Sequence, residues 1–101
     1  GITMPNLSGI EATEEVLKVS PDIKIIALSI HSGQQSVKEM LHAGAVGYLL
    51  KDEAPEELLR AVEKVKNGEM FLSSGVTRAA LTKDEKEDKI EDVNILQTKL
   101  N

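Results

Sequence analysis

The chain has 101 residues, 41% of them hydrophobic and 29% charged, with a net charge of −5. This length allows one small domain, and the acidic balance argues against nucleic-acid binding, which requires clustered lysine and arginine. The chain has no cysteine, which excludes disulfides and thiolate metal sites and is compatible with a cytoplasmic protein. No apolar run is long enough to cross a membrane, so we expect no membrane partner.

The first predicted helix begins directly after Ser8. Ser8 and Glu11 have the spacing of a capping box, and the apolar positions of the segment follow at helical intervals. A Ser-Pro-Asp sequence at residues 20–22 ends this helix. Residues 23–30 (IKIIALSI) then form a short run of aliphatic residues without clean alternation. Such a run predicts a strand that is covered on both faces.

A second pair of elements repeats this arrangement. Residues 32–44 predict a helix that ends at Gly44, and residues 46–50 (VGYLL) predict another buried strand. A third helix is predicted from Pro55, at a first helical position, to the Asn67-Gly68 pair. Its expected buried face consists of Leu58, Leu59, Val62 and Val65.

The resulting order is α-β-α-β-α, which indicates right-handed crossovers and a doubly wound parallel α/β sheet. Two parallel strands make a poor sheet, so we expect the first half of the fold to be missing from this sequence and the sheet to be completed by association. Residues 70–81 predict a short strand or turn and then a helical turn. We therefore assign residues 1–81 to one unit and residues 82–101 to a charged tail or linker.

The tail allows two interpretations. It contains four lysines and six acidic residues, and its apolar residues recur at steps of three and four. These residues are Ile90, Val93, Leu96 and Leu100. They are compatible with an amphipathic helix that packs on the domain or pairs with its own copy. A solvated tail explains the composition equally well.

Two polar residues stand at predicted strand ends. Ser29 closes the first strand and Lys51 directly follows the second, and ligands of open parallel sheets bind beyond the carboxyl ends of the strands. A hydroxyl and an ammonium group near one rim suit a small oxyanion such as a phosphoryl group. Hydroxyls and lysines are also common at strand ends for structural reasons, so their spacing alone leaves both interpretations open.

Four stretches of the sequence, in order, carry a family resemblance: MPNLSGIEAT, IIALSIH, AGAVGYLLKD and PEELLRAVEKVKNGEMFLSSGV. Together they resemble the C-terminal part of a receiver domain from a two-component response regulator of the NarL/LuxR type. The resemblance covers about residues 1–81. It implies a partial flavodoxin-like, CheY-like fold.

The resemblance also implies roles for individual residues. Ser29 takes the position of the switch hydroxyl, Tyr48 that of the switch aromatic, and Lys51 that of the lysine that contacts the phosphoryl group. Residues 34–66 would build the face that rearranges on phosphorylation and serves as a dimer or partner surface in the family.

The phosphoacceptor position departs from the family. Met4 and Pro5 match the active-site loop, and the aspartate of the family stands three residues before this methionine. Here that position is Gly1, which has no side chain to phosphorylate. The acidic pair that binds Mg²⁺ belongs to a first strand, so we expect no cofactor in this chain and Mg²⁺ only in an intact parent receiver.

The resemblance implies that the intact parent takes its phosphoryl group from a sensor histidine kinase and regulates transcription. Residues 81–87 (LTKDEKE) begin like a LuxR-type helix-turn-helix domain, but an acidic segment follows, so we expect no direct DNA binding by this chain. The alternative is a phosphorylation-independent dimerisation or interaction module. An independent enzyme has the least support, because no glycine-rich phosphate loop and no recognisable nucleophile arrangement occur.

Overall fold

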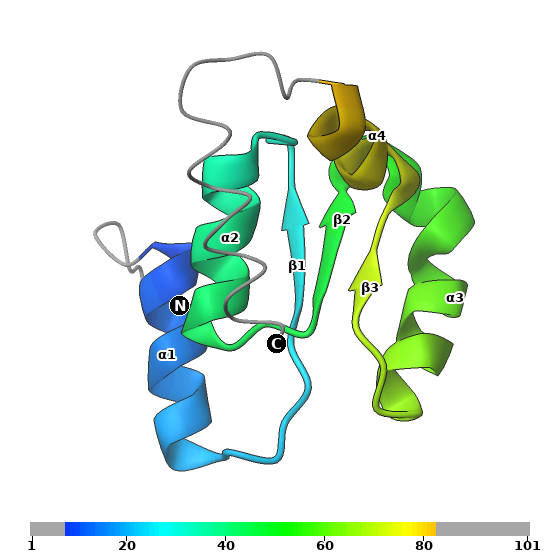
Figure 1. Cartoon of the computed structure of the whole chain (residues 1–101). Coiled ribbons are helices and arrows are strands. Elements are labelled where there is room, and N and C mark those ends of the chain that lie inside the picture. The colour runs from blue at the N-terminus through cyan, green and yellow to red at the C-terminus, as the bar shows by residue number, and fades with distance from the viewer. Residues whose placement is uncertain (1–7, 83–101) are drawn as a thin grey trace.

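Helices and short parallel strands alternate along the described part of the chain, residues 8–82, in the computed structural model (Figure 1). The elements, in chain order, are α1 (Gly9–Val19), β1 (Ile26–Ser29), α2 (Gln34–Ala43), β2 (Gly47–Leu50), the 3-10 helix η1 (Lys51–Glu53), α3 (Ala54–Lys66), β3 (Phe71–Leu72) and α4 (Ser74–Thr82). The predicted α/β class and the order of the first five predicted elements are confirmed. The predicted tail helix and the Met4-Pro5 loop lie outside the described residues.

The sheet has three parallel strands in the order β1-β2-β3. The sequence predicted two paired strands and, after the third helix, only a short strand or turn. The pairing of β3 with β2 was therefore not predicted. Its backbone joins β2 through Phe71 N–H, which donates to the carbonyl of Val46 (3.1 Å), and Ser73 N–H, which donates to the carbonyl of Tyr48 (3.0 Å). The predicted two-stranded sheet was therefore incomplete. β3 has only two residues, and it forms a strand because its backbone pairs with the free edge of β2.

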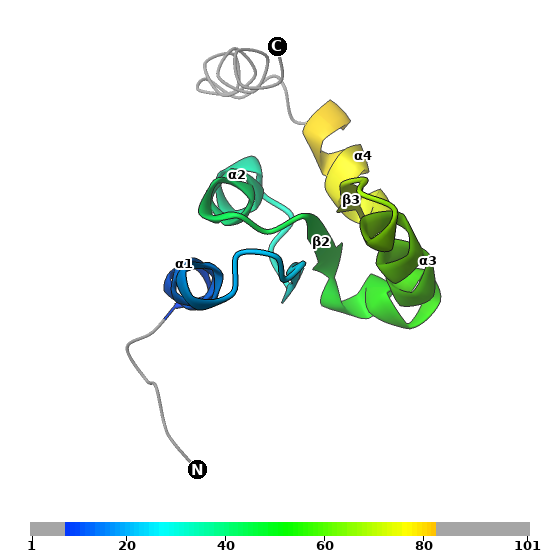
Figure 2. The ribbon, with the colours of Figure 1, turned by 90° about the horizontal axis from the view of Figure 1, so that it is seen from below.

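The two faces of the sheet carry separate apolar clusters, and Figure 2 shows α2 and α3 on either side of the strands. Val37 of α2 packs with Ala27 and Tyr48 on one face. On the other face, Ala61 and Val65 of α3 pack with residues of β2 and β3. Both connections move across the sheet in the same direction, yet their helices lie on opposite faces. The connections therefore have opposite hands, and one departs from the right-handed crossovers that we expected.

The helix ends follow from local sequence. Ser8 N–H donates to Glu11 Oε1 and Glu11 N–H donates to Ser8 Oγ, both at 3.1 Å, so the predicted capping box is confirmed. Gly44 ends α2 with φ of 121°. A β-carbon there would also collide with the side chain of Leu17. The left-handed conformation therefore favours glycine at this position, and a β-carbon would also force the end of the Leu17 side chain to move.

The predicted buried face of α3 is only partly right. Val65 is buried, as expected, but Leu59 is 84% exposed, and Leu58 and Val62 are also exposed. Ala61 is fully buried and forms the centre of the contact with the sheet. Leu59 lies two residues from Ala61, about 200° around the helix, so both cannot face the sheet.

α4 is longer than the helical turn predicted for this region and has nine residues. It packs through Val76 on the same face of the sheet as α2 and lies beyond the carboxyl ends of the strands in Figure 1. No helix within residues 8–82 has the length and apolar character needed to cross a membrane.

Candidate functional site

Ser29 and Tyr48 lie on neighbouring strands and on the same face of the sheet, which follows from the parallel register that pairs Ala27 with Tyr48 and Ser29 with Leu50. Both line one open cleft of about 480 Å³ between α1, β1 and α2. The structure therefore brings together two of the three residues to which the resemblance assigned a switch role.

A single loop residue connects these two side chains. The Ser29 hydroxyl oxygen accepts a hydrogen bond from the backbone N–H of His31 (2.9 Å), and the Tyr48 hydroxyl donates to the carbonyl of His31 (2.7 Å). Tyr48 is only 1% exposed, and its ring belongs to the cluster that α2 covers. The β1–α2 loop is thus held at His31 from two strands, because Ser29 and Tyr48 bind the two successive peptide groups that flank the His31 α-carbon.

Lys51 occupies a different place. It is exposed, it begins η1 directly after β2, and it is not among the residues that line the cleft of Ser29 and Tyr48. The register nevertheless places Lys51 one residue beyond the pairing partner of Ser29. Gly1, Met4 and Pro5 lie outside the described residues.

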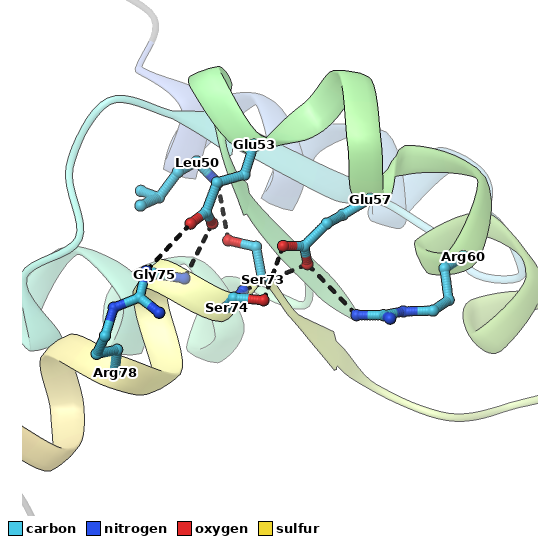
Figure 3. A network of polar contacts seen from close by, with 8 residues as sticks. All are labelled: Leu50, Glu53, Glu57, Arg60, Ser73, Ser74, Gly75 and Arg78. Carbon is cyan, nitrogen blue, oxygen red and sulfur yellow. Dashed lines mark hydrogen bonds and ion pairs between the residues drawn. The ribbon is translucent and has the colours of Figure 1, made fainter.

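Beyond Lys51, two carboxylates hold the beginning of α4 (Figure 3). Glu53 Oε1 accepts a hydrogen bond from Gly75 N–H (3.0 Å), and Glu53 Oε2 lies 3.7 Å from Nη2 of Arg78. Hydrogen bonding by the Ser73 side chain and by Gly75, together with the positive charge of Arg78, lowers the pKa of Glu53 despite its partial burial. The carboxylate is therefore stabilised in its ionised form.

Glu57, one helical turn further on, binds the neighbouring residue. Its carboxylate oxygens accept hydrogen bonds from the backbone N–H (3.3 Å) and the hydroxyl (2.8 Å) of Ser74. Arg60 Nη2 lies 3.6 Å from the same carboxylate. Two successive N–H groups that have no partner within α4 are thus satisfied by side chains from η1 and α3, and negative charge stands at the positive end of the helix.

This network was not predicted from the sequence. Its hydrogen bonds to Ser74 and Gly75 join residues that are 17 and 22 positions apart along the chain. The signal that could have suggested it is a pair of glutamates four residues apart together with a Ser-Ser-Gly sequence at residues 73–75. That sequence is typical of a helix start.

The described residues do not fit a metal ion. Within residues 8–82, no group of three or more histidine, aspartate or glutamate side chains could hold one. We therefore derive no chemical step through Mg²⁺ for this part of the chain.

A parallel α/β sheet with a serine at the carboxyl end of β1 and a buried tyrosine in β2 is compatible with a receiver-like module, and sequence comparison agrees. The model of the response regulator receiver domain family matches residues 1–63. The chain belongs to this family, so the resemblance found in the sequence is confirmed.

Individual relatives of this chain are named as response regulators or transcriptional regulatory proteins. The chain is 34% identical to the response regulator UvrY of Escherichia coli over 77 residues, which are 76% of this chain and 35% of UvrY. It is 40% identical to the transcriptional regulatory protein DegU of Brevibacillus brevis over 76 residues, 75% of this chain and 32% of DegU. The chain thus spans about a third of the length of these curated relatives.

Solved structures show the same likeness. A LuxR-family two-component response regulator from Aurantimonas matches with a TM-score of 0.68 and 30% identity over 75% of this chain and 54% of that one. The isolated receiver domain of RcsB from Salmonella enterica matches with a TM-score of 0.62 and 25% identity over 68% of this chain and 52% of that one. The predicted CheY-like fold is thereby confirmed.

Proposed function

We propose that this chain acts as the switch-bearing part of a receiver in a two-component response regulator, with Ser29, Tyr48 and Lys51 as the residues that respond to a phosphoryl group. The observation that carries the proposal is the shared contact of Ser29 and Tyr48 with His31. In the intact parent, a sensor histidine kinase donates the phosphoryl group and the output is transcription regulation, as the names of the relatives suggest.

The hydrogen bonds of Ser29 support this role. The Ser29 oxygen accepts from His31, so its own O–H remains available to donate to a phosphoryl oxygen. Lys51 adds a point charge from the next strand end. When Ser29 moves toward the phosphoryl group, the His31 peptide moves with it and the bond to Tyr48 is remade. The bound phosphoryl group thus favours one of two loop arrangements.

The chain itself does not carry the acceptor in this proposal, because Gly1 stands where the family has aspartate and glycine offers no oxygen to phosphorylate. Incubation with phosphoramidate and Mg²⁺, followed by mass spectrometry of the intact chain, tests this point. We expect no phosphoryl group on a carboxylate. An alkali-labile acyl phosphate on any aspartate or glutamate of the chain would contradict the proposal, whereas the alkali-stable adduct that this reagent can form on His31 or His42 would leave the expectation met.

A chimera tests the sensing residues. The segment of the UvrY receiver that ends at the acceptor aspartate is joined in front of Ile2, and the product is treated with acetyl phosphate. We expect the amide signal of His31 to shift on phosphorylation, and Ser29→Ala and Lys51→Ala to abolish that shift. Lys24→Ala, which removes an exposed lysine at the other end of β1, is the matched control. A phosphorylated chimera with an unchanged His31 signal would refute the proposal.

Self-association without phosphorylation is the second candidate function, and one observation favours it. Within the described residues β1 pairs only with β2, and Leu28 of β1 is 51% exposed. Sedimentation velocity at increasing concentration tests this candidate. Leu28→Glu should weaken a dimer that forms through β1, whereas Leu59→Glu, on exposed α3, should not. A folded monomer at all concentrations would exclude it.

A further inference from the structure

An apolar groove of about 420 Å³ lies between α2, β3 and α4, and the proposed switch does not use it. Its apolar lining comes from Val37, Leu41, Met70, Leu72, Val76 and Ala80. Lys38 and His42 of α2 add polar atoms, and no carboxylate is found among its described lining residues. An occupant therefore needs an apolar stripe, and acidic residues beside that stripe suit the positive charge of Lys38.

The described part of the chain ends beside this groove. Ala80, in the last turn of α4, lines the groove, and its carbonyl accepts a hydrogen bond from Gln34 Nε2 of α2 (3.3 Å). This contact ties the end of α4 to the beginning of α2. The residues that follow Thr82 therefore start at the rim of the groove.

The sequence after Thr82 has the composition that the groove requires. Residues 83–92 contain six carboxylates and three lysines. The apolar residues Ile90, Val93, Leu96 and Leu100 recur at steps of three and four, which is the spacing of one helical face. Eleven residues in a helix span about 16 Å, similar to the ten residues of α2 beside the groove.

The connecting segment is long enough. Residues 83–89 separate Thr82 from Ile90, and seven extended residues reach about 25 Å at most. A tether of this length keeps the apolar segment at an effective concentration in the millimolar range. The chain's own segment therefore has an advantage over a second copy at ordinary protein concentrations.

We propose that residues 90–100 dock in this groove as an amphipathic helix of the same molecule, with the acidic residues before them near Lys38. This inference does not depend on the phosphoryl switch. Docking covers the apolar residues of α2, β3 and α4 and leaves the polar side of the segment in water. The groove is then a site of intramolecular recognition within the full chain.

A spin label provides the test, since the chain has no cysteine of its own. Thr98→Cys places the label on the side of the predicted helix opposite its apolar stripe. In the full-length labelled chain, we expect loss of amide peak intensity at Leu41, Leu72 and Val76, and none at Glu63 on the other face of the sheet. Equal intensities at these positions in the oxidised and reduced label states would overturn the proposal.

Two further arms decide which segment occupies the groove. When the spin-labelled chain is mixed with an isotopically labelled chain without the spin label, we expect no loss, and a loss at the groove would show that a second copy binds there instead. Leu96→Glu should restore the lost intensities in the spin-labelled chain. Ile95→Glu makes the same apolar-to-acidic change on the side of the predicted helix opposite the stripe, about 140° from Ile90, and should leave the losses in place. Identical behaviour of these two variants would also overturn the proposal.

Discussion

Replacement of Glu53 with alanine should detach the beginning of α4 from η1. The substitution removes the acceptor of the Gly75 N–H at 3.0 Å and the partner of Arg78. The Glu53 side chain is only 19% exposed, so water replaces these contacts incompletely. Because α4 packs on the sheet through Val76, we expect the loss to affect the stability of the whole described fold.

The magnitude follows from the individual contacts. Loss of a helix-capping side chain costs about 0.5–2 kcal/mol, and a hydrogen bond to a charged group contributes about 1.5–3 kcal/mol. Both ranges describe the same Gly75 contact and are not added. The Arg78 side chain is 68% exposed, so its ion pair adds less than about 1 kcal/mol. We therefore expect Glu53→Ala to lower the free energy of unfolding by about 2 kcal/mol.

Equilibrium urea unfolding followed by far-ultraviolet circular dichroism measures this change. With a slope of about 1–3 kcal/mol per molar urea for a small protein, the midpoint should fall by about 1 M. Hydrogen exchange at the amides of Gly75 and Val76 should accelerate as well, because these groups report on the start of α4. Glu63→Ala is the control, since Glu63 is an exposed residue of α3.

The same unfolding midpoint and the same exchange rates at α4 in Glu53→Ala and Glu63→Ala would refute this prediction. In that case the carboxylate would not hold the helix. A double-mutant cycle with Arg78→Ala separates the contributions, and its coupling energy should remain below about 1 kcal/mol because the pair is largely exposed.

Three further predictions concern pH, the core and a glycine. The folded state lowers the pKa of Glu53, so its contribution is present above the ordinary value of 4.5 and disappears as the pH falls through the folded pKa. Urea titrations should therefore show a steeper acid loss in the wild-type chain than in Glu53→Gln. Leu49→Ala, at a fully buried position, should cost about 2–5 kcal/mol in the same assay, whereas Leu59→Ala should change stability by less than about 0.5 kcal/mol. Gly44→Ala should lower the thermal midpoint by the equivalent of about 1–3 kcal/mol, because φ is 121° there.

The first part of the fold could be predicted because its signals are local. Ser8 and Glu11 bond to each other within one helical turn, and Gly44 ends α2 through its own backbone conformation. β3 could not be placed in the same way. Its two residues become a strand only through their bonds to the neighbouring β2, and its connection has the opposite hand to that of β1–α2–β2.

The candidate site likewise has some features that could be predicted from the sequence and others that depend on the three-dimensional packing. Family resemblance indicated Ser29 and Tyr48, but their common contact with His31 depends on the path of the β1–α2 loop. Similarly, Glu53 and Glu57 are ordinary first-turn acidic residues in the sequence. Their role toward a helix that starts 17 or more positions later follows only from the packing of α4 over the sheet.

The two glutamates have a consequence for protein engineering. Each residue inserted between Glu53 and Glu57 would turn the second carboxylate by about 100° around the helix axis and away from α4. The solvent-exposed turn at residues 67–70 is the place where chain length can vary instead. A helical reporter that continues α4 without interruption after Thr82 would point in the direction of α4. Each residue added at the junction would rotate the reporter by about 100° around the helix axis, so its orientation relative to Lys51 could be adjusted.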